Sequence, residues 1–157
     1  MNQIATPIAA AETQSPKDLI TALASAGRSA QRVLASMSSD ARANALKLAA
    51  KHLRADAETI LAENAKDLEA GRENGLAKAM LDRLALDDER LEGIASAVEA
   101  VASLPDPVGE VISSSERHNG LKLSRVRVPI GTIGIIYESR PNVTADAAAL
   151  CVTIVSN

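Results

Sequence analysis

Aromatic residues are almost absent from this sequence of 157 residues, which contains one tyrosine, no tryptophan and no phenylalanine. Single-stranded nucleic acid binds largely by stacking its bases on aromatic side chains. A basic excess is lacking too, because 17 Lys and Arg stand against 20 Asp and Glu, for a net charge of −3. Phosphate backbones are attracted by an excess of positive charge. The composition therefore argues against nucleic acid as a partner.

Cysteine, histidine and long apolar runs are scarce as well. The single cysteine, Cys151, cannot form an internal disulfide, and His52 and His118 are too far apart in the sequence to predict a metal site. The longest uncharged apolar run, residues 147–155, falls short of the roughly 20 residues that cross a bilayer. The N-terminus lacks the basic start and apolar core of a secretory signal. We expect a cytoplasmic protein that does not contact membranes.

Alanine is abundant, and 25 of the 30 alanines lie in the first hundred residues. Because alanine loses no side-chain entropy in a helix, this region favours helices. Apolar residues recur there at helical spacing, and capping residues precede several of the runs. The first predicted helix begins at Ser15–Pro16 and the second at Ser39–Asp40. The third ends at Asn74–Gly75, and a shorter fourth helix spans Leu76–Leu84. The last begins at Asp87 and has an apolar stripe of Leu91, Ile94, Ala95, Val98 and Val101.

The sequence changes character after residue 103, where β-branched residues become frequent. Val108–Ile112 and Leu121–Val128 are two such runs, separated by polar residues and closed by Asn119–Gly120. Asparagine followed by glycine is typical of the tight turn between antiparallel strands. The sequence predicts a β-hairpin here, with a slip in the apolar alternation near Ser124.

Residues 130–137 form a near-continuous apolar run, as expected for a strand that is buried on both faces. A polar turn at 138–144 follows, and Ala145–Leu150 returns to a helical composition. Strand, turn and helix make the first half of a βα unit. Ligands of open α/β sheets bind at the carboxyl ends of such strands, so we expect the chemistry at 138–144.

Spacing alone leaves the roles of individual residues in this turn open. Asn142, with Thr144 and Asp146, is more readily interpreted as capping the following helix than as a catalytic group. Arg140 could pair with Glu138 or hold a phosphate with its bidentate guanidinium, and a solvated ion pair is the simpler interpretation.

The glycines and the cysteine of this region give weak signals. Gly131 and Gly134 lie before or within the predicted strand, so they favour close packing over a dinucleotide-binding turn. Cys151 has no basic or histidine neighbour in the sequence that would lower the pKa of its thiol, and we interpret it as a buried small apolar residue.

The segment 126–151, which reads Val-Arg-Val-Pro-Ile-Gly-Thr-Ile-Gly-Ile-Ile-Tyr-Glu-Ser-Arg-Pro-Asn-Val-Thr-Ala-Asp-Ala-Ala-Ala-Leu-Cys, closely resembles γ-glutamyl phosphate reductase, also called glutamate-5-semialdehyde dehydrogenase. Residues 64–76, 81–86 and 104–110 resemble the same family in the same order. The resemblance implies an α/β fold like that of the aldehyde dehydrogenase superfamily. This part of the fold would be mostly helical, with a β-hairpin and the first strand of the cofactor-binding sheet.

The resemblance also implies an activity, the NADPH-dependent reduction of L-glutamyl 5-phosphate to L-glutamate 5-semialdehyde with release of phosphate in proline biosynthesis. A cysteine thiolate of the family attacks the acyl phosphate, and hydride from NADPH reduces the thioester. The asparagine that matches Asn142 donates its side-chain N–H to the developing oxyanion, which reverses the preference for a cap. Tyr137, Glu138, Ser139 and Arg140 would border the cofactor and substrate pocket.

By the same resemblance, residues 1–107 are the helical part of the cofactor-binding domain and 108–128 the hairpin of the oligomerisation domain, so a homo-oligomer is expected. Residues 129–157 are the first βα unit of the cofactor sheet. The family's nucleophilic cysteine lies further along the chain than Cys151, so we expect a truncated portion that is inactive alone. The unpaired strand favours association. The alternatives are an interaction module that pairs with itself or with a full-length reductase, and a nonfunctional relic.

Overall fold

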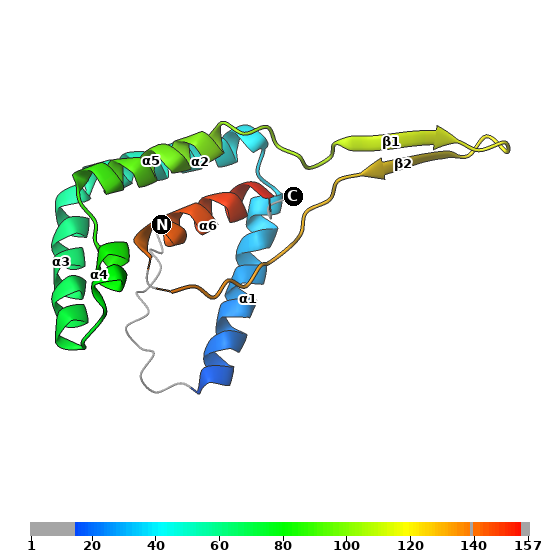
Figure 1. The fold of residues 1–157 in the computed structure, drawn as a ribbon. Coiled ribbons are helices and arrows are strands. Elements are labelled where there is room, and N and C mark those ends of the chain that lie inside the picture. The colour runs from blue at the N-terminus through cyan, green and yellow to red at the C-terminus, as the bar shows by residue number, and fades with distance from the viewer. Residues whose placement is uncertain (1–14, 139, 155–157) are drawn as a thin grey trace, which may run out of the picture.

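The structure is a computed structural model that describes residues 15–138 and 140–154 (Figure 1). These residues form α1 (Pro16–Ala35), α2 (Ser39–Ala55), α3 (Ala57–Glu73), α4 (Lys78–Leu84), α5 (Asp88–Ala102), β1 (Val111–Glu116), β2 (Lys122–Val126) and α6 (Pro141–Ile154). The two strands pair with each other in an antiparallel sheet. The expectation of a mostly helical chain with a β-hairpin is confirmed.

The predicted helix boundaries are largely confirmed because they depend on local capping. The Ser15 hydroxyl accepts a hydrogen bond from the Asp18 amide at 3.2 Å, and the Asp87 carboxylate accepts one from the Arg90 amide at 2.7 Å. The start of α2 differs by one residue, since Ser38 and not Ser39 has the extended backbone of a cap. Gly75 follows the end of α3 with φ +72°, a conformation that favours glycine.

A small core holds α2, α5 and α6 together. Its buried members are Leu46 and Ala50 of α2, Ala95, Val98 and Ala102 of α5, and Ala149 of α6. Because four of these six residues are alanines, the helix backbones can approach closely. The expected stripe of α5 is confirmed, since Leu91 and Ile94 are also buried. We refer to α2, α3, α5 and α6 as the helical body.

Helix α1 has an apolar stripe but no buried residue. Its Ile20 and Val33 are more than half exposed. In Figure 1 the connection that leads to α6 crosses α1. A Cβ atom added at Gly27 would lie 2.9 Å from the Thr132 methyl carbon, so glycine permits this close approach.

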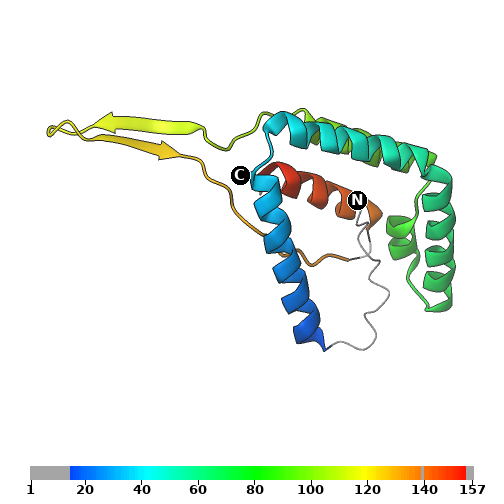
Figure 2. The ribbon, with the colours of Figure 1, turned by 180° about the vertical axis from the view of Figure 1, so that it is seen from behind.

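The hairpin projects from the helical body as a two-stranded ribbon, and both views show it clear of the helices (Figures 1 and 2). The predicted hairpin is confirmed, and β1 runs further than expected, through the serines up to Glu116. Gly120 in the connecting turn has φ +84°. The irregularity in the pairing lies between Val111 and Ser113 of β1, and the slip had been expected near Ser124 of β2. Every residue of both strands is exposed.

The predicted buried strand at 130–137 is the main correction. Residues 127–138 contain no strand, and Ile130, Ile133, Ile135 and Ile136 are all exposed. A strand requires a neighbour that takes up its backbone hydrogen bonds. No segment among 15–138 and 140–154 pairs with this one, so it remains an extended connection. We refer to residues 108–138 as the arm.

Helix α6 starts at Pro141, four residues before the predicted Ala145. Proline suits the first turn of a helix because its missing N–H would be unbonded there anyway. The early start brings Asn142 and Thr144 into the helix, which changes what their side chains can reach.

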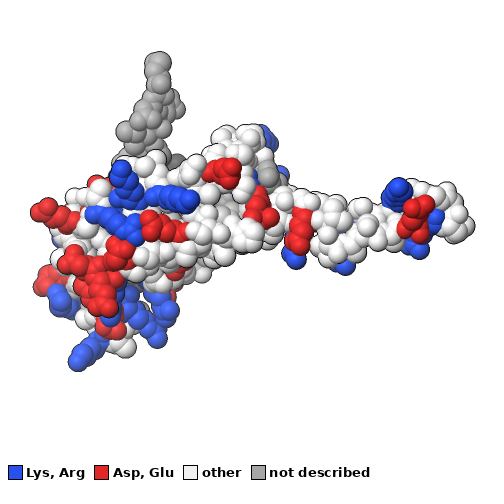
Figure 3. Space-filling view, turned by 90° about the horizontal axis from the view of Figure 1, so that it is seen from above, with Lys and Arg blue, Asp and Glu red and all other residues white. Residues whose placement is uncertain are grey.

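Positive and negative side chains lie side by side over the helical body in Figure 3, with no extended region of one sign on that face. Across the described ranges, no helix has both the length and the apolar character needed to cross a membrane.

Candidate functional site

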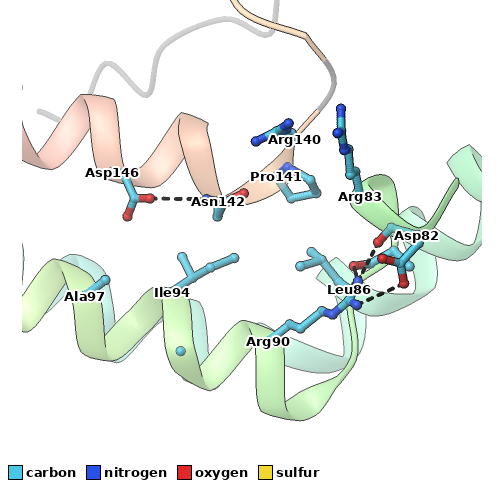
Figure 4. Close-up of a pocket in the computed structure, with 12 residues that line it drawn as sticks. Asp82, Arg83, Leu86, Arg90, Ile94, Ala97, Arg140, Pro141, Asn142 and Asp146 are labelled. Carbon is cyan, nitrogen blue, oxygen red and sulfur yellow. Dashed lines mark hydrogen bonds and ion pairs between the residues drawn. The ribbon is translucent and has the colours of Figure 1, made fainter. Parts of the chain in front are cut away.

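A cleft of about 610 Å³ lies between the start of α6 on one side and, on the other, α5, the end of α4 and the segment that joins them (Figure 4). Its lining combines apolar side chains with charged ones. The lining residues are Asp82, Arg83, Ala85, Leu86, Arg90, Gly93, Ile94, Ala97, Arg140, Pro141, Asn142 and Asp146. The cleft therefore brings two of the predicted site residues, Asn142 and Arg140, to one wall.

Asn142 lies in the first turn of α6 and is exposed to the cleft. Its side-chain amide donates a hydrogen bond to the Asp146 carboxylate at 3.3 Å, one turn further along the same helix (Figure 4). Because Asn142 is itself helical, it does not cap α6, and the capping interpretation is wrong. Its N–H donor faces a solvent-accessible cleft beside a helix N-terminus.

Arg140 and Glu138 form the ion pair that the sequence suggested, with 2.9 Å between Arg140 Nη2 and Glu138 Oε1. The same Glu138 oxygen lies 3.3 Å from Arg83 Nη1 on α4. Two guanidinium groups from distant parts of the chain thus share one carboxylate oxygen. The Arg140 Nε atom is buried, and no hydrogen-bond partner for it is found among residues 15–138 and 140–154.

Tyr137 connects the arm to α6. Its hydroxyl lies 2.7 Å from the Thr144 hydroxyl, in a hydrogen bond in which either group can donate. Tyr137 is therefore held next to Glu138 and Arg140 at the start of α6. Ser139, the fourth residue expected to border the pocket, lies outside the described residues.

Asn64 is a residue of this region that the sequence analysis did not identify. It is 5% exposed, and its amide nitrogen donates to the Leu84 carbonyl at 2.9 Å while its oxygen accepts from the Leu86 amide at 2.8 Å. The sequence does contain a pattern that identifies Asn64, because this residue lies between Ile60 and Leu68 on an apolar stripe at helical spacing. A polar residue on a buried stripe must have hydrogen-bond partners.

Arg90 secures the same segment from the opposite side. Its Nη1 donates to the carbonyls of Asp82 at 2.5 Å and Ala85 at 2.9 Å, and its Nη2 lies 3.1 Å from the Asp82 carboxylate. The guanidinium of Arg90 is thus occupied by the protein itself. Arg83 lies between residues that Arg90 and Asn64 hold in place.

Cys151 lies on α6 and lines a separate, mostly apolar cavity together with Ile130, Ile133 and Ile135. It is half-buried and is not among the residues of the cleft that contains Asn142. Within the described parts of the chain, no group of three or more His, Cys, Asp or Glu side chains is arranged to hold a metal ion.

Comparison with known proteins gives a consistent result. No family model matches the chain. The γ-glutamyl phosphate reductase of Novosphingobium aromaticivorans is 64% identical over 138 residues, which are 88% of this chain and 32% of the relative. That of Xanthomonas oryzae pv. oryzae is 57% identical over 133 residues, or 85% of this chain. The chain belongs to the γ-glutamyl phosphate reductase family.

Solved structures of the family share the fold. The γ-glutamyl phosphate reductase of Thermotoga maritima superposes with a TM-score of 0.81 at 44% identity and covers 85% of this chain. The Saccharomyces cerevisiae enzyme also gives 0.81, at 34% identity, and covers 91%. The 157-residue chain spans about a third of the length of these relatives, 32% and 36% of the two structures. The names of the relatives describe a reductase, so the family is one of oxidoreductases.

Proposed function

We propose that this chain contributes part of the active site of a cytoplasmic, NADPH-dependent reductase that converts L-glutamyl 5-phosphate to L-glutamate 5-semialdehyde in proline biosynthesis. The family membership supports the reaction. The position of Asn142, exposed at the start of α6 in a cleft large enough for a small substrate, is the observation that carries the proposal.

Asn142 would stabilise the oxyanion that forms when the acyl carbon is attacked. In the part of the chain that the structure describes, its Nδ2 donates to Asp146 alone, over a long 3.3 Å, so a rotation of the side chain frees it for a substrate oxygen. The positive end of the α6 dipole favours negative charge at the same place. A donor that is aimed at charge growing in the transition state is typically worth ~10²–10³ in rate.

The attacking thiol would come from outside these 157 residues. Cys151 lines the apolar cavity behind α6 and not the cleft. Its side chain is therefore separated from Asn142, which would have to act on the same acyl carbon. On this proposal the isolated chain binds ligands but does not turn over substrate.

The described residues fit NADPH only in part. Arg140 offers a guanidinium to a phosphate, with Tyr137, Glu138 and Ser139 next to it in the sequence. However, residues 130–137 pair with no strand among the described residues, so there is no sheet edge on which a dinucleotide could lie. NADPH would supply the hydride when bound, and we assign no step of hydride transfer to this chain.

A chimera tests the proposal. The 138 matching residues of this chain would replace the corresponding segment of the Novosphingobium aromaticivorans relative, and NADP-dependent, phosphate-dependent oxidation of glutamate semialdehyde would be measured. We expect an active chimera, and Asn142→Ala should lower kcat by ~10²–10³ with little change in melting temperature. Asn44→Ala, on the exposed surface of α2, is the matched control. An inactive but folded chimera, or equal effects of the two variants, would refute the proposal.

A second candidate function is association through the arm, in a homo-oligomer or with a full-length reductase. Both strands of the hairpin are exposed, including Val111, Leu123 and Val126. An exposed strand edge is a template for pairing with another chain. Sedimentation of the purified chain, alone and mixed with the complete relative, should show complexes that Leu123→Lys weakens. A strictly monomeric chain in both samples would exclude this function.

A further inference from the structure

We propose that Arg83 and Arg140 form the binding site for the phosphoryl group of the substrate, with Glu138 occupying that place when no ligand is bound. The inference rests on the proposed function for the identity of the ligand. The site itself follows from how the two arginines, the glutamate and the start of α6 are arranged.

The two arginines come from different elements and converge. Arg83 lies in the last turn of α4 and Arg140 immediately before α6, yet both reach the same Glu138 oxygen, at 3.3 Å and 2.9 Å. Figure 4 shows their side chains on either side of Pro141 at the start of α6. Planar guanidinium forks from two directions are suited to a group with several acceptor oxygens.

The charged side chains around the two arginines balance, because Arg83, Arg90 and Arg140 stand against Asp82, Glu138 and Asp146. Asp82 is paired with Arg90, and Asp146 accepts the hydrogen bond from Asn142. Among the described residues, Glu138 is the carboxylate that forms ion pairs with both Arg83 and Arg140. The first turn of α6 carries no acidic residue, so the positive end of its dipole favours an anion at this place.

The present arrangement also leaves a donor unused. No described residue bonds the buried Arg140 Nε, although buried polar groups nearly always have a hydrogen-bond partner. A single carboxylate shared by two guanidinium groups cannot accept from all of their donors. A phosphoryl group has more acceptor oxygens than the carboxylate it would displace, and it can take up bonds that Glu138 leaves unmade.

The position of Arg83 is fixed by the protein before any ligand arrives. Asn64 holds the carbonyl of Leu84, the residue after Arg83, and the amide of Leu86. Arg90 holds the carbonyl of Asp82, the residue before Arg83. We therefore assign Asn64 as a positioning residue for this site, since it acts through the segment that carries Arg83.

The spacing between Arg140 and Asn142 identifies which anionic group is bound. In an acyl phosphate the acyl carbon bears both the carbonyl oxygen and the bridging oxygen that connects it to the phosphoryl group. Asn142, the proposed oxyanion donor, follows Arg140 by two residues at the same helix start. When the thiolate forms its bond to the acyl carbon, the C–O bond breaks and phosphate leaves with the electron pair. The two arginines would stabilise the charge that grows on it.

Tyr137 provides a direct probe of binding in the full 157-residue chain, without turnover. It is the only aromatic residue of the sequence and lies beside Glu138. We expect inorganic phosphate to change the tyrosine fluorescence saturably. Arg83→Gln and Arg140→Gln should each raise the Kd about tenfold, the effect of losing roughly one charge-assisted hydrogen bond. Glu138→Gln should lower the Kd, because it removes the competing carboxylate.

The controls separate this site from general charge effects. Arg72→Gln removes an exposed arginine whose ion pair within the described ranges is with Glu69 on its own helix, and the Kd should not change. Arg140→Lys, which keeps the charge but loses the fork, should fall between wild type and Arg140→Gln. Asn64→Asp or Asn64→Ala should weaken phosphate binding less than Arg83→Gln. No saturable change with phosphate, or equal effects of Arg72→Gln and Arg140→Gln in folded chains, would overturn the proposal.

Other ligands distinguish the source of the anion. L-Glutamate, which offers carboxylates only, should bind more weakly than phosphate. If NADP⁺ binds far more tightly than phosphate with the same dependence on Arg83 and Arg140, the site belongs to the cofactor and our assignment is wrong. In the chimera, both arginine variants should raise the KM for phosphate more than Arg72→Gln does. An inactive chimera with intact phosphate binding would refute the proposed function alone, and an active chimera with unchanged KM would refute this inference alone.

Discussion

The helical body and the arm obtain their structure in different ways. In the body, α2, α5 and α6 bury Leu46, Val98 and Ala149 against one another, so each helix covers the apolar faces of its neighbours. In the arm, the hairpin satisfies its backbone through its own two strands but buries none of their side chains. The comparison teaches that backbone hydrogen bonds alone can form a two-stranded ribbon, whereas a buried core is needed to hold several elements in fixed positions relative to one another.

The segment after the hairpin lacks both kinds of support. Its isoleucines are exposed, with Ile136 fully so, and its backbone pairs with no strand among residues 15–138 and 140–154. It is nevertheless the segment that brings Tyr137 and Glu138 to the start of α6, where they contact Thr144 and Arg140. The contacts that hold its end, Tyr137 to Thr144 and Glu138 to Arg83, therefore determine the geometry of the site.

The largest expected difference in stability between the body and the arm comes from replacing one leucine of each by alanine. Leu91→Ala, at a side chain 3% exposed, should lower the free energy of unfolding by about 2–5 kcal/mol. Leu123→Ala, at one 40% exposed, should change it by about 0.5 kcal/mol or less. Urea denaturation followed by circular dichroism measures both. Equal losses would mean that the arm and the body unfold as one unit.

A somewhat smaller effect is expected where the body joins the arm. Arg42 is 2% exposed; its guanidinium pairs with Asp106 and donates to the Met37 carbonyl at 2.6 Å. Arg42→Met leaves the Asp106 carboxylate without its partner, although that carboxylate still accepts from the Val108 amide at 3.0 Å. We expect a loss of about 3 kcal/mol, the lower end for a broken buried pair, because Asp106 keeps some contact with water.

The matched control for this pair is exposed. Arg72→Met breaks the pair with Glu69 on the surface of α3 and should cost about 0–1 kcal/mol. The double replacement Arg42→Met with Asp106→Asn should recover part of the loss, because no unpaired charge then remains. Urea denaturation of the three variants would contradict the interpretation if the control lost as much stability as Arg42→Met.

The helices could be predicted from the sequence because their signals are local. Ser15 and Asp87 cap through residues three positions away, and the stripe of α5 follows the helical period. The strand at 130–137 could not, because an apolar run becomes a strand only when another strand lies beside it. The start of α6 was missed because β-branched Val143 and Thr144 disfavour a helix on propensity alone.

The site was predicted in part for the same reason. Asn142 and Arg140 lie close together in the sequence and both line the cleft, and Glu138 pairs with Arg140 beside it. Arg83 reaches Glu138 across 55 residues, and Asn64 reaches Leu84 across 20. Such pairings depend on how α3 and α4 pack, which no local pattern specifies.

The smallest effect concerns a surface contact of the body, and it depends on pH. Arg54 of α2 bonds the carboxylates of Glu92 at 2.8 Å and Glu99 at 2.7 Å on α5. These bonds lower the pKa of Glu92 to about 2 and also lower the pKa of Glu99, while the two carboxylates raise the pKa of Arg54. Their stabilisation is present above the pKa of an unfolded glutamate, roughly 4.3, and is lost as the pH falls through the folded values.

We therefore expect urea denaturation midpoints to fall as the pH is lowered from about 5 to about 2, and to fall less in Arg54→Gln. Because the groups are exposed, the difference should be small and should shrink at high salt. Arg28→Gln, on α1, for which no ion pair is found among the described residues, is the matched control and should follow the wild type. If Arg54→Gln follows the wild type as well, the contact between α2 and α5 depends on their apolar faces alone, and the exposed ion pairs of the body contribute no more to its stability than those of the arm.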